Sequence, residues 1–229
     1  VCSPARASLL TGRIPSQHGV HDWIRAGDTY DIKQEPEGKG RVIEYLAGMR
    51  GYTDVLAEHG YLCALSGKWH LGDVHHAQKG FTAWNVHAKG GGPYYNAPMV
   101  EGDRVVEAPG YVTDVITDNA LSFLETQAQT DERPFYLGVH YTAPHSPWQR
   151  EHHPAALWDE YYTTCPFHSV PDGQAPPAWV ERLSIPVKDA ETRRTYLSGY
   201  YAAVTAMDAN VGRLLDWLEA NGLRENTLV

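Results

Sequence analysis

Apolar residues recur along the chain with two spacings, which predict helices alternating with short buried strands. A helical period places apolar side chains on one face over residues 53–60, 111–129 and 189–221. Two short continuous apolar runs, at residues 61–66 and 135–141, are typical of strands that a parallel sheet buries on both faces. This alternation indicates an α/β domain with a largely parallel sheet.

The other stretches contain more turn-forming residues. Residues 42–47 form one further helix-like segment, whereas residues 25–41 are polar and are interpreted as an exposed excursion. Residues 73–110 are rich in histidine and glycine, and we expect residues 90–98 to form a shaped loop at the rim of a cleft. Residues 149–188 carry proline, histidine and aromatic residues without a clear period, and so long a connection is usually functional or peripheral.

Composition narrows the class of protein. The chain has 229 residues, which suits one large α/β domain or two small ones. Its formal net charge of −9 argues against nucleic acid as a partner, because that binding needs clustered Lys and Arg. No apolar run has the length of a membrane span, and three cysteines do not make a disulfide framework. The sequence begins inside a motif and ends in a strand-like run, so we expect a fragment.

The first twelve residues carry the clearest chemical signal. Pro4 suits the start of a helix, and Gly12 can adopt the left-handed conformation that ends one. Cys2 then lies where backbone N–H groups and the helix dipole favour an anion. Arg6 follows one turn later and can direct its guanidinium to the same anion.

Two further motifs follow the predicted strands. Gly-Lys-Trp-His-Leu-Gly at residues 67–72 supplies Lys68 and His70, and Thr-Ala-Pro-His-Ser-Pro at residues 142–147 supplies His145. Ligands of open α/β sheets bind beyond the carboxyl ends of the strands. We therefore expect these three side chains at a site of chemistry.

The three motifs together resemble the signature of the type I sulfatases, a family of the alkaline phosphatase superfamily. The resemblance covers residues 2–13, 67–72 and 142–147, and the order of the elements fits throughout the chain. It implies an alkaline-phosphatase-like α/β fold, with a largely parallel sheet and helices on both faces. It also implies that residues 1–229 are a partial sulfatase catalytic domain, truncated at both ends.

In that family a cysteine is oxidised to formylglycine by a formylglycine-generating enzyme, and the hydrated aldehyde attacks sulfur. The resemblance thus implies that Cys2 becomes the nucleophile and a ligand of a divalent cation, usually Ca²⁺. Arg6 and Lys68 would hold charge around the diol and the sulfate, and Lys68 would bind the sulfate. His70 would act as the base on the formylglycine hydroxyl. His145 would bind a sulfate oxygen or assist the leaving group.

The implied function is hydrolysis of sulfate monoesters, with a sulfated carbohydrate as the preferred substrate. The family's metal carboxylates and a second active-site lysine would fall outside residues 1–229, so we expect this fragment alone to be inactive. The sequence assigns no compartment, although a sulfated glycan would suit the periplasm or the cell exterior.

Two other functions stay open. A phosphonate monoester or phosphodiester hydrolase can share the first motif. A catalytically inactive glycan-binding relative is the second alternative, and the retained Cys2, Arg6, Lys68, His70 and His145 argue against it.

Several polar residues invite a functional interpretation that the pattern does not favour. The pair His75 and His76 lacks the spacing of a helical zinc site and is interpreted as a solvated loop. Residues 90–92, three consecutive glycines, lack the lysine and the strand–helix context of a phosphate-binding loop. Asp208 and Asn210 are interpreted as a solvated helix face or a structural hydrogen bond.

The aromatic residues near the motifs are weaker candidates. Tyr94, Tyr95 and Asn96 are candidate specificity residues on the expected rim loop. His140 lies back inside the second predicted strand and is interpreted as a core histidine. Trp148 would either stack on a sugar face or pack, and the sequence does not decide.

Overall fold

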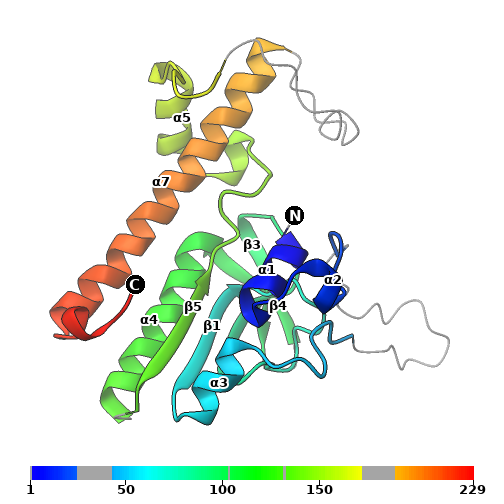
Figure 1. Ribbon diagram of the computed structural model, residues 1–229. Coiled ribbons are helices and arrows are strands. Elements are labelled where there is room, and N and C mark those ends of the chain that lie inside the picture. Colours follow the sequence, from blue (N-terminus) through cyan, green and yellow to red (C-terminus); the bar gives the residue numbers. More distant parts are fainter. Residues whose placement is uncertain (1, 25–42, 103, 131–132, 172–188) are drawn as a thin grey trace.

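The computed structural model describes residues 2–24, 43–102, 104–130, 133–171 and 189–229 (Figure 1). It is an α/β fold in which one central sheet carries helices on both faces, as predicted. The predicted exposed excursion at residues 25–41 lies outside the described residues. Among the described residues, no helix has both the length and the apolar character needed to cross a bilayer.

Within the described residues, the sheet has five strands in the order β4-β3-β2-β1-β5. Its centre is parallel, because β1 (Leu62–Lys68) pairs in parallel with both β2 (Phe81–His87) and β5 (Phe135–His140). An antiparallel hairpin of β3 (Tyr95–Glu101) and β4 (Arg104–Tyr111) extends the sheet beyond β2. The sheet is therefore mixed, with its parallel part around β1.

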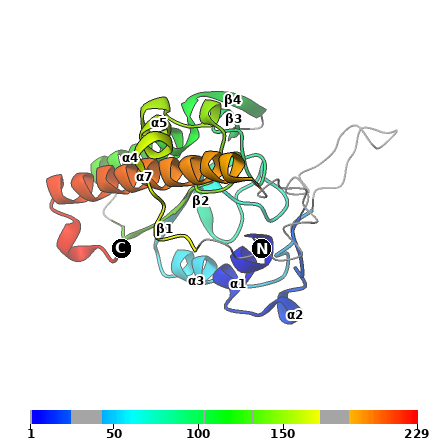
Figure 2. The same cartoon turned by 90° about the horizontal axis from the view of Figure 1, so that it is seen from above.

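The helices form two layers. The helical segments are α1 Cys2–Thr11, α2 Pro15–His18, α3 Tyr52–Glu58, α4 Val112–Thr130, α5 Ala155–Thr164 and α7 Ala190–Ala220, with 3-10 turns at Arg150–His152 and Arg224–Asn226. Figure 2 shows α1 and α3 on one side of the sheet, and α4, α5 and α7 on the other. The long α7 begins at Asp189, whose carboxylate accepts a hydrogen bond from the Thr192 N–H at 2.7 Å.

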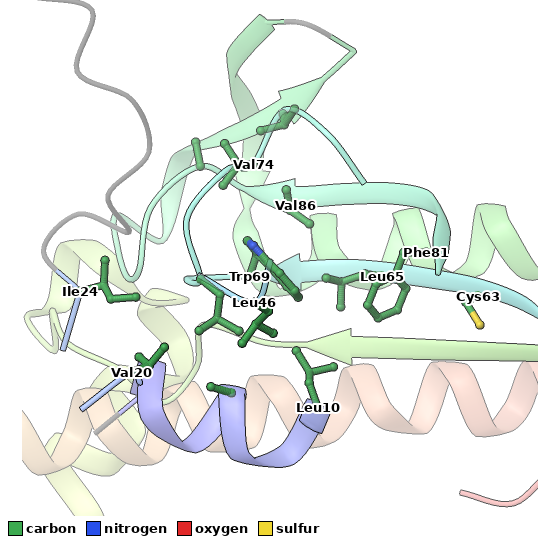
Figure 3. Packing of buried hydrophobic residues seen from close by; sticks show 14 residues of the cluster. Leu10, Val20, Ile24, Leu46, Cys63, Leu65, Trp69, Val74, Phe81 and Val86 are labelled. Carbon is green, nitrogen blue, oxygen red and sulfur yellow. The ribbon is translucent and has the colours of Figure 1, made fainter. Parts of the chain in front are cut away.

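The apolar core on the α1 side holds the first two motifs together. Leu10 of α1 and Leu65 of β1 belong to one buried cluster with Trp69 (Figure 3). The Trp69 ring packs edge-on against Phe81 and Trp84, with ring centroids 6.5 and 5.1 Å apart. This anchor fixes the backbone of the segment that follows β1.

The three longest predicted helices and both predicted strands are confirmed to within a few residues. Residues 90–94 form neither helix nor strand, as expected for the rim loop, but residues 95–98 belong to β3. The pattern of residues 73–110 did not predict β2, β3 or β4. Prolines at positions 98 and 109 lower strand propensity. Pro109 is tolerated because β4 is an edge strand, whereas Pro98 lies in β3, which pairs on both sides. The helix-like segment at residues 42–47 is also wrong: its described part forms an isolated bridge at Glu44 and a turn.

A buried polar contact joins α4 to α7. Asn210 is 4% exposed, and its side-chain amide donates to Asp114 Oδ1 at 2.7 Å and to the Ala206 carbonyl at 2.9 Å. Arg213 donates to Asn210 Oδ1 at 2.9 Å. The predicted structural role of Asn210 is thus confirmed, and Asp208 lies exposed on the helix surface.

Trp148 packs against α7. Its indole N–H donates to the Pro144 carbonyl at 3.0 Å, and its ring lies 5.6 Å from the Tyr196 ring. A Cβ on Gly199 would lie 1.9 Å from the Trp148 carbonyl oxygen, so this close approach requires glycine. Of the two alternatives left by the sequence, the structure favours packing.

Replacing Gly199 with alanine should therefore destabilise the protein by about 1–3 kcal/mol, because backbone atoms cannot yield to the new methyl group. Gly212→Ala on the same helix is the matched control: a Cβ there meets nothing within 4 Å, so it should stabilise the helix by roughly 0.5–1 kcal/mol. Urea unfolding of both variants measures the difference. Equal free energies of unfolding would contradict the packing of Trp148 on α7.

Candidate active site

Cys2 is half-buried at the N-terminal end of α1. The helix begins at Cys2, two residues earlier than predicted, so Pro4 lies within the first turn, where its missing N–H leaves no hydrogen bond unmade. Gly12, at a φ of +66°, follows the end of the helix. The sulfur-bearing residue is therefore close to the unpaired N–H groups and the positive end of the helix dipole.

Arg6 connects α1 to the carboxyl ends of β1 and β5. Its Nη1 donates to the Lys68 carbonyl at 2.7 Å and to His140 Nδ1 at 3.0 Å. Burial lowers the pKa of Arg6 to about 10, while the negative charge of Cys2 opposes this shift. Arg6 thus remains a cation near neutral pH.

Lys68 and His70 lie at the carboxyl end of β1 and are almost completely buried, with 3% and 2% of their surfaces exposed. His70 has a left-handed backbone, with a φ of +61°. Its Nε2 lies 2.8 Å from the Ile24 carbonyl, which can only accept, so Nε2 carries the proton. Nδ1 is then the basic nitrogen, and it is buried without a hydrogen-bond partner among the described protein groups.

The surroundings of Cys2 favour its anion. Burial by itself raises the pKa of the thiol, but the neighbouring His70 ring and the positive charge of Lys68 outweigh it. The pKa of Cys2 falls from an ordinary 9.0 to about 6. Lys68 experiences the reciprocal effect: burial lowers its pKa, and the charge of Cys2 raises it.

His145 belongs to the same electrostatic group. Desolvation lowers its pKa, as do the charges of Lys68 and His70, although the residue as a whole is exposed. Its Nδ1 lies 2.8 Å from the Ser146 carbonyl and therefore donates to it. The structure thus brings Cys2, Arg6, Lys68, His70 and His145 into one group, as expected from their motifs.

His140 was interpreted as a core histidine, but its ring accepts the hydrogen bond from Arg6. Burial lowers the pKa of His140 to about 4, and the Arg6 charge acts in the same direction, so the ring is neutral. His140 pairs with Gly67 in the parallel register of β1 and β5, so it lies at the same carboxyl end of the sheet as Lys68. Its place at the carboxyl end of a predicted strand was the signal that could have identified it.

His87 is a second residue that sequence reasoning passed over. It pairs with Lys68 in the β1–β2 register and is fully buried. Burial lowers its pKa to about 4, and the charges of Lys68 and His70 add to the effect. Because β2 was not predicted, no signal placed His87 at a strand end.

The rim residues differ from expectation. Tyr94 is fully buried, so it is not a specificity residue; its hydroxyl donates to the His145 carbonyl at 2.7 Å. Tyr95 and Asn96 are exposed at the start of β3, which leaves them as candidates. His76 binds the buried Asp73 carboxylate through Nδ1 at 2.6 Å.

The described residues do not fit a complete divalent-metal site. Among them no three His, Cys, Asp or Glu side chains are grouped so that they could hold an ion. A hard cation such as Ca²⁺ needs six to eight oxygen ligands, whereas Cys2 is surrounded by an ammonium and an imidazole. We therefore derive no step through a metal.

Comparison with known proteins identifies the family. A sequence model of the family described as "Sulfatase" matches residues 1–229. The chain belongs to the sulfatase family. Sulfatases similar to it include YdeN of Escherichia coli, which is 27% identical over 256 residues and is matched over 38% of its own length by the whole of this chain. An ulvan-active sulfatase of Formosa agariphila is 30% identical over 241 residues, again with the whole chain matched to 40% of the relative.

A further sulfatase sequence and two solved structures are also similar to this chain. An N-acetylglucosamine-6-O-sulfatase of Bacteroides thetaiotaomicron is 26% identical, with 99% of this chain covering 48% of the relative. A structure solved with its substrate D-glucosamine-2-N,6-O-disulfate has a TM-score of 0.64 at 24% identity, over 99% of this chain and 54% of that one. A sulfatase from Pseudoalteromonas sp. has a TM-score of 0.55 at 17% identity, over 97% and 43%. These structures share the alkaline-phosphatase-like fold, and the chain spans less than half the length of the three curated sulfatases.

In the chain with an unmodified Cys2, alkylation of that thiol by iodoacetamide should reach half its maximal rate near pH 6 instead of near pH 9. The thiolate is the reactive form, so Lys68→Met should raise the pKa and slow alkylation at pH 6.5. Peptide mass spectrometry measures labelling of Cys2 separately from Cys63 and Cys165. Lys79→Met is the control, because Lys79 binds the Met49 carbonyl instead. If Lys68→Met leaves the pH dependence of Cys2 alkylation unchanged, the charge of Lys68 does not lower the pKa of Cys2.

Proposed function

We propose that the complete protein hydrolyses sulfate monoesters at Cys2. The observation that carries this proposal is the group of cations and imidazoles around Cys2, which lowers its pKa to about 6 and is suited to an anionic substrate. A sulfate ester carries one negative charge, and more charge develops on its leaving oxygen during cleavage. Fixed donors that already face this position stabilise the developing charge without reorganising.

The nucleophile in this proposal is formylglycine, made from Cys2 by a formylglycine-generating enzyme. When hydrated, this group supplies a hydroxyl that attacks sulfur and a second hydroxyl that allows sulfate to be expelled. The half-buried position of Cys2 at the start of α1 supports the assignment, because the residue is partly exposed and interacts with the charge of Lys68.

Arg6 and Lys68 would balance the charge of the nucleophile and the bound sulfate. Arg6 is held by the Lys68 carbonyl and His140, so its position is fixed before substrate arrives. Lys68 is buried, and an anion beside it would raise its pKa and keep it cationic. Sulfate binding and charge neutralisation are thus assigned to Lys68.

His70 would hold the proton of the attacking or expelling hydroxyl at Nδ1. The Nε2–H bond to the Ile24 carbonyl fixes the tautomer that leaves Nδ1 basic. Such a positioned base typically contributes about 10²- to 10⁴-fold to the rate.

His145 would bind a sulfate oxygen or assist the leaving alcohol through Nε2. Its Nδ1–H is committed to the Ser146 carbonyl, so only Nε2 is available to the substrate. A bound anion would raise the pKa of His145 and favour the imidazolium that donates from Nε2.

A sulfated carbohydrate is the substrate class that we propose. One relative is an N-acetylglucosamine-6-O-sulfatase and another is an ulvan-active sulfatase. One similar solved structure contains a sulfated glucosamine as its substrate. We further propose that oxygen ligands for a divalent cation, Ca²⁺ by the family resemblance, come from outside residues 1–229, with formylglycine at position 2 as one more ligand. The fragment alone would then be inactive.

The complete protein, purified from its own host, should release sulfate from aryl sulfates and from 6-O-sulfated N-acetylglucosamine. Cys2→Ala should abolish turnover, and His70→Gln should lower kcat by about 10²- to 10⁴-fold, since a general base is lost. His59→Gln is the control, because His59 is exposed at the end of α3. Ion chromatography of the released sulfate gives the rates.

Matched aryl phosphodiesters and phosphonate monoesters separate the alternatives. Faster turnover of those esters than of the aryl sulfate would replace the proposal with the related hydrolase. Binding of sulfated glycans without any hydrolysis would point to the inactive glycan-binding relative.

A further inference from the structure

Three consecutive glycines, Gly90 to Gly92, lie directly against the last two motifs. A Cβ added to Gly90 would fall 2.3 Å from Cε1 and 2.4 Å from Nε2 of the His70 ring. A Cβ on Gly91 would fall 2.9 Å from both Cε1 and Nδ1 of His145. These separations are far below van der Waals contact, so the segment can take this course only without side chains.

Each histidine ring is held by a hydrogen bond. The His70 ring is buried, and its Nε2 is bound to the Ile24 carbonyl. The His145 ring is tied through Nδ1 to the Ser146 carbonyl. A methyl group at position 90 or 91 would therefore displace a ring or the glycine backbone, and either movement would change the relation of the two rings to Cys2.

The segment is fixed at both of its ends. At its start His87 Nδ1 lies 2.8 Å from the Lys89 carbonyl oxygen and 2.9 Å from the Lys89 nitrogen, and His87 is itself held in the sheet beside Lys68. At its end the Tyr94 carbonyl accepts from the Val112 N–H at 2.7 Å. The glycines thus lie in the connection between β2 and β3, which is anchored to β2 at one end and to the start of α4 at the other.

Tyr94 also reaches the His145 backbone. Its hydroxyl donates to the His145 carbonyl at 2.7 Å, while its ring stacks on Tyr111 with centroids 5.4 Å apart. His153 supports the same loop from a second direction, since its Nε2 lies 3.0 Å from the Pro147 carbonyl and donates to it. The loop that carries His145 is therefore held by buried groups on residues outside the three motifs.

We propose that Gly90 to Gly92, anchored by His87 and Tyr94, form a positioning segment that sets the places of the His70 and His145 rings relative to Cys2. The glycines act by their lack of side chains and Tyr94 by its single hydrogen bond. They are positioning residues, because they act through the two histidines. The consequence for catalysis rests on the proposed function, whereas the placement of the rings does not.

The first test measures the rings themselves. Hydrogen–deuterium exchange at the Cε1 position of each of the twelve histidines in residues 1–229 can be followed by peptide mass spectrometry of the complete protein. Gly90→Ala should make exchange at His70 several-fold faster, and Gly91→Ala should change exchange at His145. Gly212→Ala, where a Cβ meets nothing within 4 Å, should leave both at the wild-type rate. Exchange at His70 and His145 that matches the control in both variants would overturn the proposal.

The second test measures turnover. Gly90→Ala and Gly91→Ala should lower kcat on an aryl sulfate by about 10- to 100-fold, because a displacement near 1 Å can cost that much. Tyr94→Phe keeps the stacked ring and should lower kcat with little change in KM. Tyr161→Phe is its control, since the Tyr161 hydroxyl binds Thr205 Oγ1 at 2.6 Å, away from the motifs. Unchanged kcat in all three test variants would overturn the catalytic consequence.

The two tests separate the possible failures. If the wild-type complete protein hydrolyses no sulfate ester, the proposed function fails, and histidine exchange still decides the positioning claim. If Gly90→Ala speeds exchange at every histidine, the variant is unfolded, and Tyr94→Phe then decides: a lower kcat supports the proposal and an unchanged kcat overturns it.

Discussion

The hydrogen bonds of the Arg6 guanidinium are the interaction on which the site depends. From one turn into α1 it reaches the Lys68 carbonyl at the end of β1 and the His140 ring at the end of β5. Those two strands are adjacent in the sheet. One side chain therefore joins the helix that carries Cys2 to the carboxyl ends of the strands, where the other two motifs begin. An apolar core of Leu10, Leu65 and Trp69 fixes the same helix from beneath. Packing thus sets the distance between the elements, and Arg6 sets the orientation at their ends.

Burying two cations in this position requires an anion. Burial lowers the pKa of both Arg6 and Lys68, and the negative charge of Cys2 opposes both shifts. Buried charges are costly unless they are paired, so this group is most stable when negative charge occupies the site. The neutral rings of His140 and His87 beside these cations avoid adding further positive charge. The electrostatics of the site therefore favour a bound anion, which agrees with membership of the sulfatase family.

The sequence predicted the elements whose pattern is local and strong. The helical stripes that became α4 and α7, and the buried runs that became β1 and β5, depend on periodicity alone. The hairpin of β3 and β4 was missed because its prolines and glycines are typical of loops. The edge position that makes Pro109 compatible with a strand is known only once the sheet is assembled.

Each of the five predicted site residues lies in a compact sequence motif, and the structure places them in one group. Their supporting residues were not found. His140 and His87 acquire their places from the parallel register with β1, which no local pattern encodes. The role of Gly90 depends on a ring twenty residues earlier in the chain, and its sequence context resembles an ordinary flexible loop. Contacts between distant segments were thus the part that sequence reasoning could not supply.

The most direct test of the account is the mass of the peptide that contains Cys2, taken from the complete protein purified from its own host. The account predicts a mass that matches formylglycine at position 2, with the remaining residues unmodified. An unmodified cysteine in that peptide would contradict the proposed nucleophile. The cationic group around Cys2 would then be an anion-binding architecture without sulfatase chemistry.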